Sequence, residues 1–554
     1  MKFYKSNIKN HKTTYLTKIT HFIVFFPILI GTFLRFFKLD WGNGHHFHPD
    51  EYHLVISANQ IDFPEQMHPH LFSYGSTTVY LIYFSKVILN ILFNYDPSLF
   101  IVGRFFSATF STLSLFVIYL IAKHIFNKPT PVFLITAVSA LTPGIIQQAH
   151  FATPESAISF WMLLGLYFSI KYLNKPNLKN VALSGISTSL AMATKITSIL
   201  TLPGPLISFC YKHIREKKFK KILLSSFIFV FVTVIFYFVA FPYSILDLQG
   251  LKHSMNYETA VGKGTQKVFY TRSFENTLPI IFQFTKILIY AIDPVNLILG
   301  TIGLVLIIYL FTKNYRKEIG AVYFLIIYFF LSYFLFNSFL YAKWTRFIAP
   351  TFPYFAIFSA LLISKVNKIN KKAGIFLAGL SMTSVIIWGI SFFAIYIKPD
   401  VRVQATAWAQ NNIPANSYIL TETGNILEAP LKGNYTKIPF DFYHLDEDPS
   451  LQDRLATELV KSDYFIIQSR RMFMDHSEKD FPLTYNFYNK LVNCNLGFEK
   501  IKTFTSFPTV PLINISLNDE TAEETWSVFD HPVIRIYKKT VNYDEETYKR
   551  ILNI

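Results

Sequence analysis

Residues 99–122, LFIVGRFFSATFSTLSLFVIYLIA, decide the fold class of this protein. The stretch contains a single charged side chain, Arg104. A helix needs about 20 apolar residues to cross the hydrocarbon core of a bilayer, so the stretch predicts a membrane span. Comparable apolar runs occur at residues 22–38, 131–148, 156–173, 181–198, 199–211, 222–241, 295–312, 320–340, 347–364 and 373–397.

Two of the apolar segments differ from the others. The run 199–211 is short and contains Pro203 and Pro205, which predicts a broken or tilted helix. Residues 76–93 could span by length, but Ser85 and Lys86 lie in their middle, and a central lysine costs at least about 2.5 kcal/mol. We therefore expect an amphipathic helix at the membrane interface there, and about eleven spans in total.

The composition supports this fold class. Hydrophobic residues make up 51% of the chain and charged residues only 16%, whereas soluble domains carry about 25% charged residues. A purely soluble protein is therefore excluded. The two cysteines, Cys210 and Cys494, lie in unrelated segments and predict no disulfide framework.

The net charge of +17 is unevenly distributed along the chain. Residues 398–554 hold 17 basic and 22 acidic side chains, a balance of -5, which leaves +22 for residues 1–397. Alternate loops between the spans are basic, as the positive-inside rule requires of cytoplasmic loops. These charges orient spans in a plasma (cytoplasmic) membrane, and we expect no nucleic-acid partner. The predicted cytoplasmic lysines and arginines begin with Lys2, Lys5, Lys9, Lys12 and Lys18 at the N-terminus and end with Lys365, Lys368, Lys371 and Lys372.

This topology predicts an α-helical polytopic membrane protein with two domains. Residues 1–397 form the membrane-embedded module, with a first outer loop over 39–98, and the N-terminus lies in the cytoplasm. Residues 398–554 form an extracytoplasmic soluble α/β domain. The pattern of this C-terminal domain predicts a helix over 402–412 and strands over 418–421, 464–468 and 533–537.

Three acidic residues are candidate catalytic groups on the outer side. Asp50 and Glu51 follow Pro49 in the first outer loop, and Glu155 follows Pro154 after the third predicted span. The simpler interpretation is that each acid stabilises a helix start, where carboxylates are favoured. Topology nevertheless brings both acidic turns to one membrane surface.

Four basic residues break the positive-inside pattern, because they lie near the outer ends of spans. Each alone is more often a side chain that extends to the interface than a ligand. Four on one leaflet predict an anionic partner, and a lipid phosphate is the anion found at that depth. They are Arg35, Arg104, Lys195 and Arg346.

Carboxylates and cations on one surface suit the transfer of a sugar from a polyprenyl phosphate. One carboxylate takes a proton from the acceptor hydroxyl, and cations stabilise the departing phosphate. In-line attack would invert the anomeric centre. The expected partners are membrane lipids, a polyprenyl-phosphate sugar donor, and an acceptor that is a glycan, a protein or a lipid.

The sequence resembles the multi-spanning glycosyltransferases of the GT-C class, over roughly residues 22–364. It is most similar to the bacterial group related to protein O-mannosyltransferases and to aminoarabinose transfer onto lipid A. The motifs that carry the resemblance are Leu34-Arg35, Pro49-Asp50-Glu51, Thr153-Pro154-Glu155, the segment from Gly185 to Lys195, and Arg346 to Pro350 with Pro353.

The resemblance implies roles for individual residues. Asp50 would be the catalytic base or an acid on the acceptor side, with Glu51 beside it, and Arg346 and Lys195 would bind the donor phosphate. Related proteins often have aspartate where Glu155 stands, so Glu155 would support the site or bind the acceptor. The tail sequence Phe529-Asp530-His531-Pro532 matches only loosely related members.

The first outer loop also carries the densest histidine cluster in the chain. His45, His46 and His48 are candidate ligands of a divalent metal, although their spacing matches no closed zinc pattern. The alternative is an aqueous loop whose polar aromatic residues contact the acceptor. His48, His53 and Tyr74 are the candidates for that role.

Two other functional classes are compatible with many spans. A transporter or lipid flippase would place ionisable residues near the middle of the membrane and often shows repeated halves; here the candidate residues gather at one interface, and no repeat is evident. A non-catalytic membrane scaffold would use the acids only to stabilise helix starts.

Overall fold

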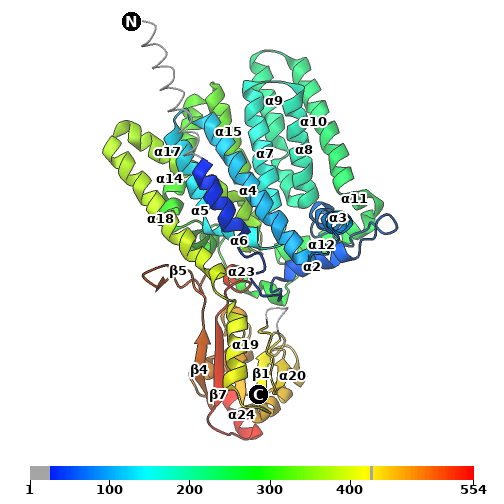
Figure 1. Cartoon of the computed structure of the whole chain (residues 1–554), viewed down its shortest axis with the longest axis vertical. Coiled ribbons are helices and arrows are strands. Elements are labelled where there is room, and N and C mark those ends of the chain that lie inside the picture. Colours follow the sequence, from blue (N-terminus) through cyan, green and yellow to red (C-terminus); the bar gives the residue numbers. More distant parts are fainter. Residues whose placement is uncertain (1–24, 424–427) are drawn as a thin grey trace.

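The computed structural model describes residues 25–423 and 428–554. The basic N-terminal residues predicted to be cytoplasmic, Lys2 to Lys18, lie outside the described residues. Figure 1 shows a bundle of long helices with a smaller unit of strands and helices at one end. That end of the bundle also carries α2 (Pro49–Asn59) and α12 (Leu248–Lys263).

Long apolar helices build the bundle. In the described residues, eight helices are long and apolar enough to cross a membrane, or nine when the bent pair α5 and α6 counts as one span. The helices of the bundle are Phe25–Phe36, α4 (Leu99–Ile125), α5 (Pro129–Leu141), α6 (Pro143–His150), α7 (Glu155–Asn174), α8 (Leu178–Thr194), α9 (Pro203–Arg215), α10 (Phe219–Ala240), α14 (Pro294–Asn314), α15 (Glu318–Ser338), α17 (Phe352–Ile369) and α18 (Lys371–Ile397).

The predicted number of about eleven spans is higher than this count because some predicted spans form short helices. Within the described residues, three predicted spans correspond to helices shorter than 18 residues: Phe25–Phe36, α8 and α9. Helix α8 ends at Thr194, and the 3-10 turn Ile196–Thr201 separates it from α9, which begins at Pro203. The predicted break near the two prolines is therefore confirmed.

Helix α3 (Ser76–Phe93) is one of the eight long apolar helices, but it lies across the bundle. In Figure 1 it is seen end-on, whereas α4, α7 and α8 run along the long axis. Much of α3 is exposed, and Lys86 Nζ lies 3.2 Å from Asp96 Oδ1. The orientation agrees with the predicted interfacial helix.

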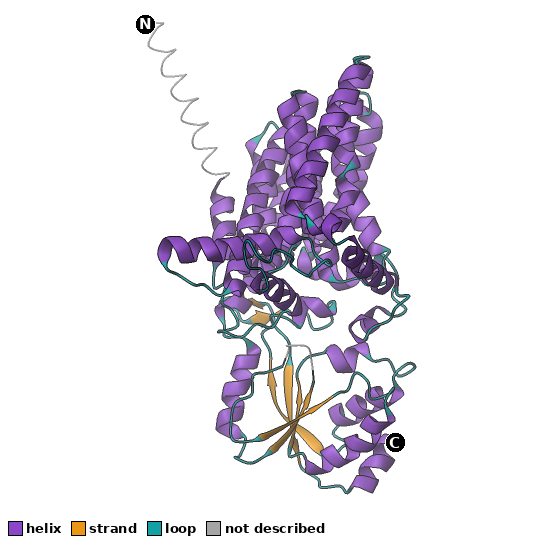
Figure 2. Cartoon of the chain, turned by 90° about the vertical axis from the view of Figure 1, so that its right-hand side faces the viewer, coloured by secondary structure: helices purple, strands orange, loops and turns teal. Residues whose placement is uncertain are grey.

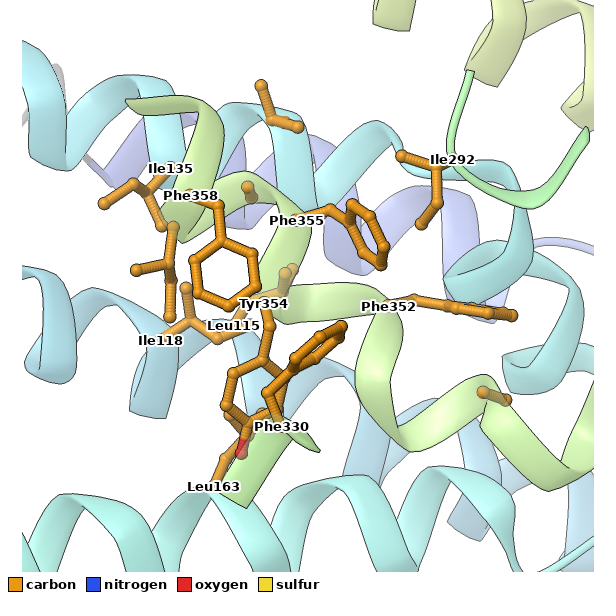
Figure 3. Packing of buried hydrophobic residues seen from close by; sticks show 14 of the residues in the cluster. Leu115, Ile118, Ile135, Leu163, Ile292, Phe330, Phe352, Tyr354, Phe355 and Phe358 are labelled. Carbon is orange, nitrogen blue, oxygen red and sulfur yellow. The ribbon is translucent and has the colours of Figure 1, made fainter. Parts of the chain in front are cut away.

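Aromatic and aliphatic side chains together fill the core between the helices (Figure 3). Phe352, Phe355 and Phe358 project from α17, and the ring of Phe330 on α15 meets that of Phe358 edge-on at 5.1 Å. Helices α14 and α17 can approach closely because Gly303 has no side chain. A Cβ at this position would lie 2.1 Å from the carbonyl oxygen of Phe358. This packing holds α17 and the short helix α16 (Thr345–Ile348) that precedes it.

The C-terminal unit contains a mixed five-stranded sheet with the order β2-β1-β3-β7-β4. Strand β1 pairs in parallel with β2 and β3, while β7 pairs antiparallel with β3 and β4. The strands are β1 (Tyr418–Glu422), β2 (Thr436–Phe440), β3 (Tyr464–Ile467), β4 (Phe498–Phe504) and β7 (Ile534–Lys539), with β5 (Thr509–Val510) and β6 (Ile515–Ser516) forming a separate hairpin.

Alternating side chains place helices on both faces of this sheet (Figure 2). Leu420 and Phe465 join one apolar cluster with α20, α22 and α24, whereas their neighbours Ile419 and Ile466 pack with α19 on the other face. The fold class predicted from the sequence, a polytopic helical module followed by an α/β unit, is confirmed. The helices of this unit are α19 (Val401–Asn412), α20 (Pro449–Lys461), α21 (Arg471–Asp475), α22 (Pro482–Val492), α23 (Glu524–Ser527) and α24 (Glu545–Leu552).

Short elements cover the end of the bundle that faces the C-terminal unit. They are α11 (Tyr243–Leu246), α12, the 3-10 helices Phe269–Phe274 and Ala349–Thr351, the π-helical turn Gln283–Leu288, and α13 (Ile289–Ala291). The basic loop between α9 and α10 lies at the opposite end of the bundle (Figure 1). The candidate site lies among the elements at the covered end.

Candidate active site

Helix α2 positions the two adjacent acids of the first outer loop. Pro49 is its first residue, and His48 caps it by accepting a hydrogen bond at Nδ1 from the backbone N–H of Asp50, at 3.2 Å. Burial, reinforced by the charges of Arg346, Arg104 and Arg471, holds the pKa of His48 well below its usual value. His48 is therefore neutral at pH 7, and its unprotonated Nδ1 can accept this bond.

Asp50 forms an ion pair with Arg346 across nearly three hundred residues of chain. Oδ2 of Asp50 pairs with Nη1 of Arg346, and the two side chains are 13% and 19% exposed. Arg346 lies on α16, and its guanidinium is 4.8 Å from the ring of Trp344. Because both groups retain some contact with solvent, a ligand can compete for either partner.

Glu51 points in a different direction and is fully buried. Arg104 donates to both carboxylate oxygens of Glu51, from Nε at 2.8 Å and from Nη2 at 2.7 Å. The backbone N–H of Ala152 donates to Oε1 at 2.7 Å, and Arg104 also donates to the carbonyl of Leu39. Both oxygens of Glu51 are thus used to join α2, α4 and the turn before α7.

Glu155 begins α7 and pairs with Lys195, whose Nζ lies 3.3 Å from Oε1. The carboxylate is 1% exposed, and no described residue offers a hydrogen-bond partner to its Oε2. Lys195 Nζ is 5.5 Å from the ring of Tyr74. Burial, together with the charges of Glu155 and Glu258, raises the pKa of Tyr74 well above its usual value, so its hydroxyl stays protonated at pH 7.

The two acid–base pairs meet at one aromatic ring. Phe347 lies 4.7 Å from Lys195 Nζ and 5.8 Å from the guanidinium carbon of Arg346. The Nε of Arg346 is buried and has no hydrogen-bond partner among the described residues. Two cations beside one ring, with an unused donor, are suited to binding a phosphate.

The structure does not bring Arg35 to this group. Its guanidinium is completely buried and donates to Ser111 Oγ and to the carbonyls of Gly31, Ser139 and Ala140. The donors of Arg35 are thus used to join the first helix to α4 and α5, and those of Arg104 to hold Glu51. Of the four predicted phosphate ligands, Lys195 and Arg346 remain near one another.

The histidines of the first outer loop point in separate directions. His46 stacks on Phe100 at 3.6 Å, His45 lies 5.9 Å from the ring of Phe47, and His53 is exposed on α2. Within residues 25–423 and 428–554, no group of three or more histidine, cysteine or acidic side chains is arranged to hold a metal ion. His45, His46 and His48 therefore form no ligand set there.

The C-terminal unit adds contacts that the sequence did not predict. The ring of Phe529 lies 4.1 Å from that of His48 and 6.0 Å from the guanidinium carbon of Arg471. Glu523 accepts hydrogen bonds from Thr345, the residue before Arg346. The tail motif at Phe529 is a weak sequence signal for one of these contacts, but neither Arg471 nor Glu523 lies in a recognisable pattern.

A protein-family comparison matches part of this chain. Residues 81–243 match the model of the dolichyl-phosphate-mannose-protein mannosyltransferases. The matched stretch contains three of the site residues, Arg104, Glu155 and Lys195. Asp50 and Arg346 lie on either side of it.

Individual proteins are also similar to this chain. A Pseudomonas fluorescens undecaprenyl phosphate-alpha-4-amino-4-deoxy-L-arabinose arabinosyl transferase is 25% identical over 230 residues, which span 40% of this chain and 40% of that relative. The Archaeoglobus fulgidus oligosaccharyltransferase structure with Zn and sulfate has 14% identity and a TM-score of 0.51, over 84% of this chain and 71% of that one. The Cupriavidus metallidurans ArnT structure bound to undecaprenyl phosphate covers 94% of this chain and 98% of that one, with 11% identity and a TM-score of 0.46.

These comparisons confirm the family resemblance predicted from the motifs. The sequence match falls on the central helices, and the fold match extends over most of the chain. The chain has the fold of the GT-C membrane glycosyltransferases, and its residues 81–243 are similar to the dolichyl-phosphate-mannose-protein mannosyltransferases.

Proposed function

We propose that this protein transfers a sugar from a polyprenyl-phosphate donor to an acceptor hydroxyl outside the cytoplasm, with inversion at the anomeric carbon. The observation that carries the proposal is the ion pair between Asp50 and Arg346 at the partly exposed end of the helical bundle. It joins a candidate base to a candidate phosphate ligand. The activities of the similar proteins and the predicted topology support the same assignment.

Binding of the donor exchanges the partners of Arg346. The donor phosphate takes the guanidinium, which leaves Asp50 free to accept a proton. Lys195, on the other side of Phe347, is the second cation for the phosphate. The phosphate gains negative charge as the sugar departs and leaves as a dianion. The two positive side chains stabilise this charge.

The chemical step needs one base. Asp50 takes the proton of the acceptor hydroxyl while the acceptor oxygen bonds to the anomeric carbon. The bond between that carbon and the phosphate oxygen breaks, and the phosphate keeps the electron pair. Glu51 does not reach the substrate in this scheme; it fixes α2 through Arg104. Glu155 holds Lys195 and offers Oε2 to the acceptor.

The orientation follows from charge. The basic loop between α9 and α10 lies at the end of the bundle away from the C-terminal unit, and the positive-inside rule assigns such loops to the cytoplasm. We therefore place Asp50 and the C-terminal unit on the outer side of the plasma membrane.

The test is a transfer assay with the full-length protein in lipid nanodiscs and a panel of polyprenyl-phosphate sugars. Asp50→Asn should lower kcat by at least about a hundredfold, in line with loss of a general base. Asp62→Asn is the matched control, because Asp62 is an exposed acid of the same outer loop. Transfer by a well-folded Asp50→Asn at the wild-type rate, or retention of configuration in the product, contradicts the proposal.

A further inference from the structure

Glu523 of the C-terminal unit binds the segment that carries Arg346. Its Oε2 accepts hydrogen bonds from the backbone N–H of Thr345 at 2.9 Å and from the hydroxyl of Thr345 at 2.7 Å. Thr345 is the first residue of α16, and Arg346 is the second. Glu523 is only 2% exposed, so these hydrogen bonds are shielded from water.

Glu523 is itself fixed on both sides. Thr525 donates to it from the backbone at 3.0 Å and from the hydroxyl at 2.5 Å. The backbone N–H of Glu523 donates to the carbonyl of Lys286 in the membrane module, at 2.8 Å. A carboxylate held at these points can fix the direction in which α16 begins, and hence the direction of the Arg346 side chain.

Six residues later, the same segment contacts the cap of α2, the helix that carries Asp50. Phe529 packs its ring on His48, the residue that caps α2 and receives the Asp50 N–H. Arg402 donates to the carbonyl of Phe529 at 2.6 Å, and its guanidinium carbon lies 3.6 Å from the ring centre of Phe47. Phe529 is thus joined to the residues that precede α2, directly to His48 through its ring and indirectly to Phe47 through Arg402.

We propose that residues 523–529 of the C-terminal unit position the Asp50–Arg346 pair, with Glu523 as the positioning residue for Arg346. This inference rests on the proposed function, because it assigns Arg346 to the donor phosphate. The C-terminal unit is then an integral part of the transferase site. Displacing a group by about 1 Å is enough to lower the rate of an oriented reaction a hundredfold.

Two pairs of variants test the role of Glu523. Glu523→Ala removes the acceptor, whereas Glu523→Gln keeps one oxygen that Thr345 can reach. Thr345→Val removes the hydroxyl with little change of shape, whereas Thr345→Ser keeps it. Glu520→Gln is the matched control, since Glu520 pairs with Arg535 inside the C-terminal unit at 2.7 Å. The measurements are kcat, KM for the donor, and the affinity for undecaprenyl phosphate alone, in nanodiscs.

We expect Glu523→Ala to bind undecaprenyl phosphate about tenfold more weakly and to lose 10- to 100-fold in kcat. Thr345→Val should show smaller losses of the same affinity and of kcat. In Glu523→Gln, Thr345→Ser and Glu520→Gln, both quantities should stay within about threefold of the wild type. If Glu523→Ala does not fold, the contrast between Thr345→Val and Thr345→Ser decides.

Arg346→Met distinguishes failure of the positioning role from failure of the proposed function. If Arg346→Met loses affinity for undecaprenyl phosphate but Glu523→Ala and Thr345→Val behave as the wild type, the positioning role is wrong and the proposed function stands. If Arg346→Met itself binds undecaprenyl phosphate and transfers sugar as the wild type does, the proposed phosphate site is wrong, and the positioning role with it.

Discussion

The carboxylate of Glu51 and the guanidinium of Arg104 form a two-point ion pair from which solvent is completely excluded. The adjacent Asp50 pairs instead with Arg346 where some solvent reaches both groups. Neighbouring acids on α2 therefore have opposite environments. The buried pair fixes the helix, and the accessible pair is available for exchange with a ligand.

The Glu51–Arg104 pair predicts a large loss of stability when one partner is removed. Glu51→Gln or Arg104→Gln leaves an uncompensated buried charge, and such losses cost about 3–5 kcal/mol. The double variant should recover part of this loss, because neither charge then remains. The measurement is the free energy of unfolding in detergent, with denaturant as the variable.

Lys86→Gln is the control for that measurement. Lys86 pairs with Asp96 at 3.2 Å, but both side chains are substantially exposed, so its loss should cost no more than about 1 kcal/mol. Equal losses for Lys86→Gln and Arg104→Gln would show that the buried pair has no special role.

Arg35 and Arg346 should respond differently to substitution by lysine. Arg35 donates only to protein groups in the buried core, so Arg35→Lys should lower the melting temperature and leave KM for the donor within about twofold. Arg346→Lys should raise that KM about tenfold or more, because lysine cannot bind phosphate at two points. A donor KM that rises in Arg35→Lys but not in Arg346→Lys would reverse the assignment.

His531 should make stability depend on pH in the alkaline range. Burial lowers its pKa, but the carboxylates of Asp519 and Asp530 outweigh burial and raise the pKa to about 10. The folded state binds this proton more tightly than the unfolded state, where histidine titrates near 6.5. The contribution is fully present below about pH 6.5 and is lost as the pH rises through about 10.

The melting temperature of the wild type should therefore fall between pH 6.5 and 10 by more than that of His531→Gln. Thermal unfolding of both proteins at half-unit pH steps provides the comparison. Parallel curves for the two proteins across this window would show that His531 does not hold its proton in the folded state.

Glu422 should have a comparable effect at lower pH. Burial raises its pKa from 4.5 to about 7, although the hydroxyl of Tyr488 and the backbone N–H of Gln468 favour the carboxylate. Because the folded pKa is raised, this contribution is present below about pH 4.5 and is lost as the pH rises through 7. Relative to the wild type, Glu422→Gln should gain about 3 kcal/mol between pH 4.5 and 8.

Unfolding of Glu422→Gln across that range checks the sign. Glu499→Gln, at an exposed position of β4, should show no such gain. A wild type that becomes more stable relative to Glu422→Gln as the pH rises would contradict the raised pKa of Glu422.

The sequence predicts the fold better than it predicts the site. Apolar runs report spans directly, because a bilayer imposes length and composition on each helix. The exceptions are local: α8 ends just before Lys195, and α5 bends into α6, where Thr142 precedes Pro143. The sequence also predicts the strands near Tyr418 and Tyr464, since β-branched and aromatic residues cluster there.

The predicted residues that form the two ion pairs beside Phe347 lie close together, but their pairing could not be predicted. Which acid pairs with which cation depends on helix packing. Glu51 and Asp50 are adjacent, yet they form ion pairs with different arginines. Arg35 shares the sequence features of the other cations and yet is used inside the core. Glu523 belongs to a different unit of the fold, so no local pattern could connect it with Arg346.

The affinity of undecaprenyl phosphate for Asp50→Asn tests the central claim most directly, because the claim is that Asp50 and the donor phosphate compete for Arg346. Asp50→Asn should bind undecaprenyl phosphate about tenfold more tightly than the wild type while it loses sugar transfer, and Arg346→Met should bind it more weakly than either. Unchanged or weaker binding by a folded Asp50→Asn, or transfer at the wild-type rate, would contradict the account.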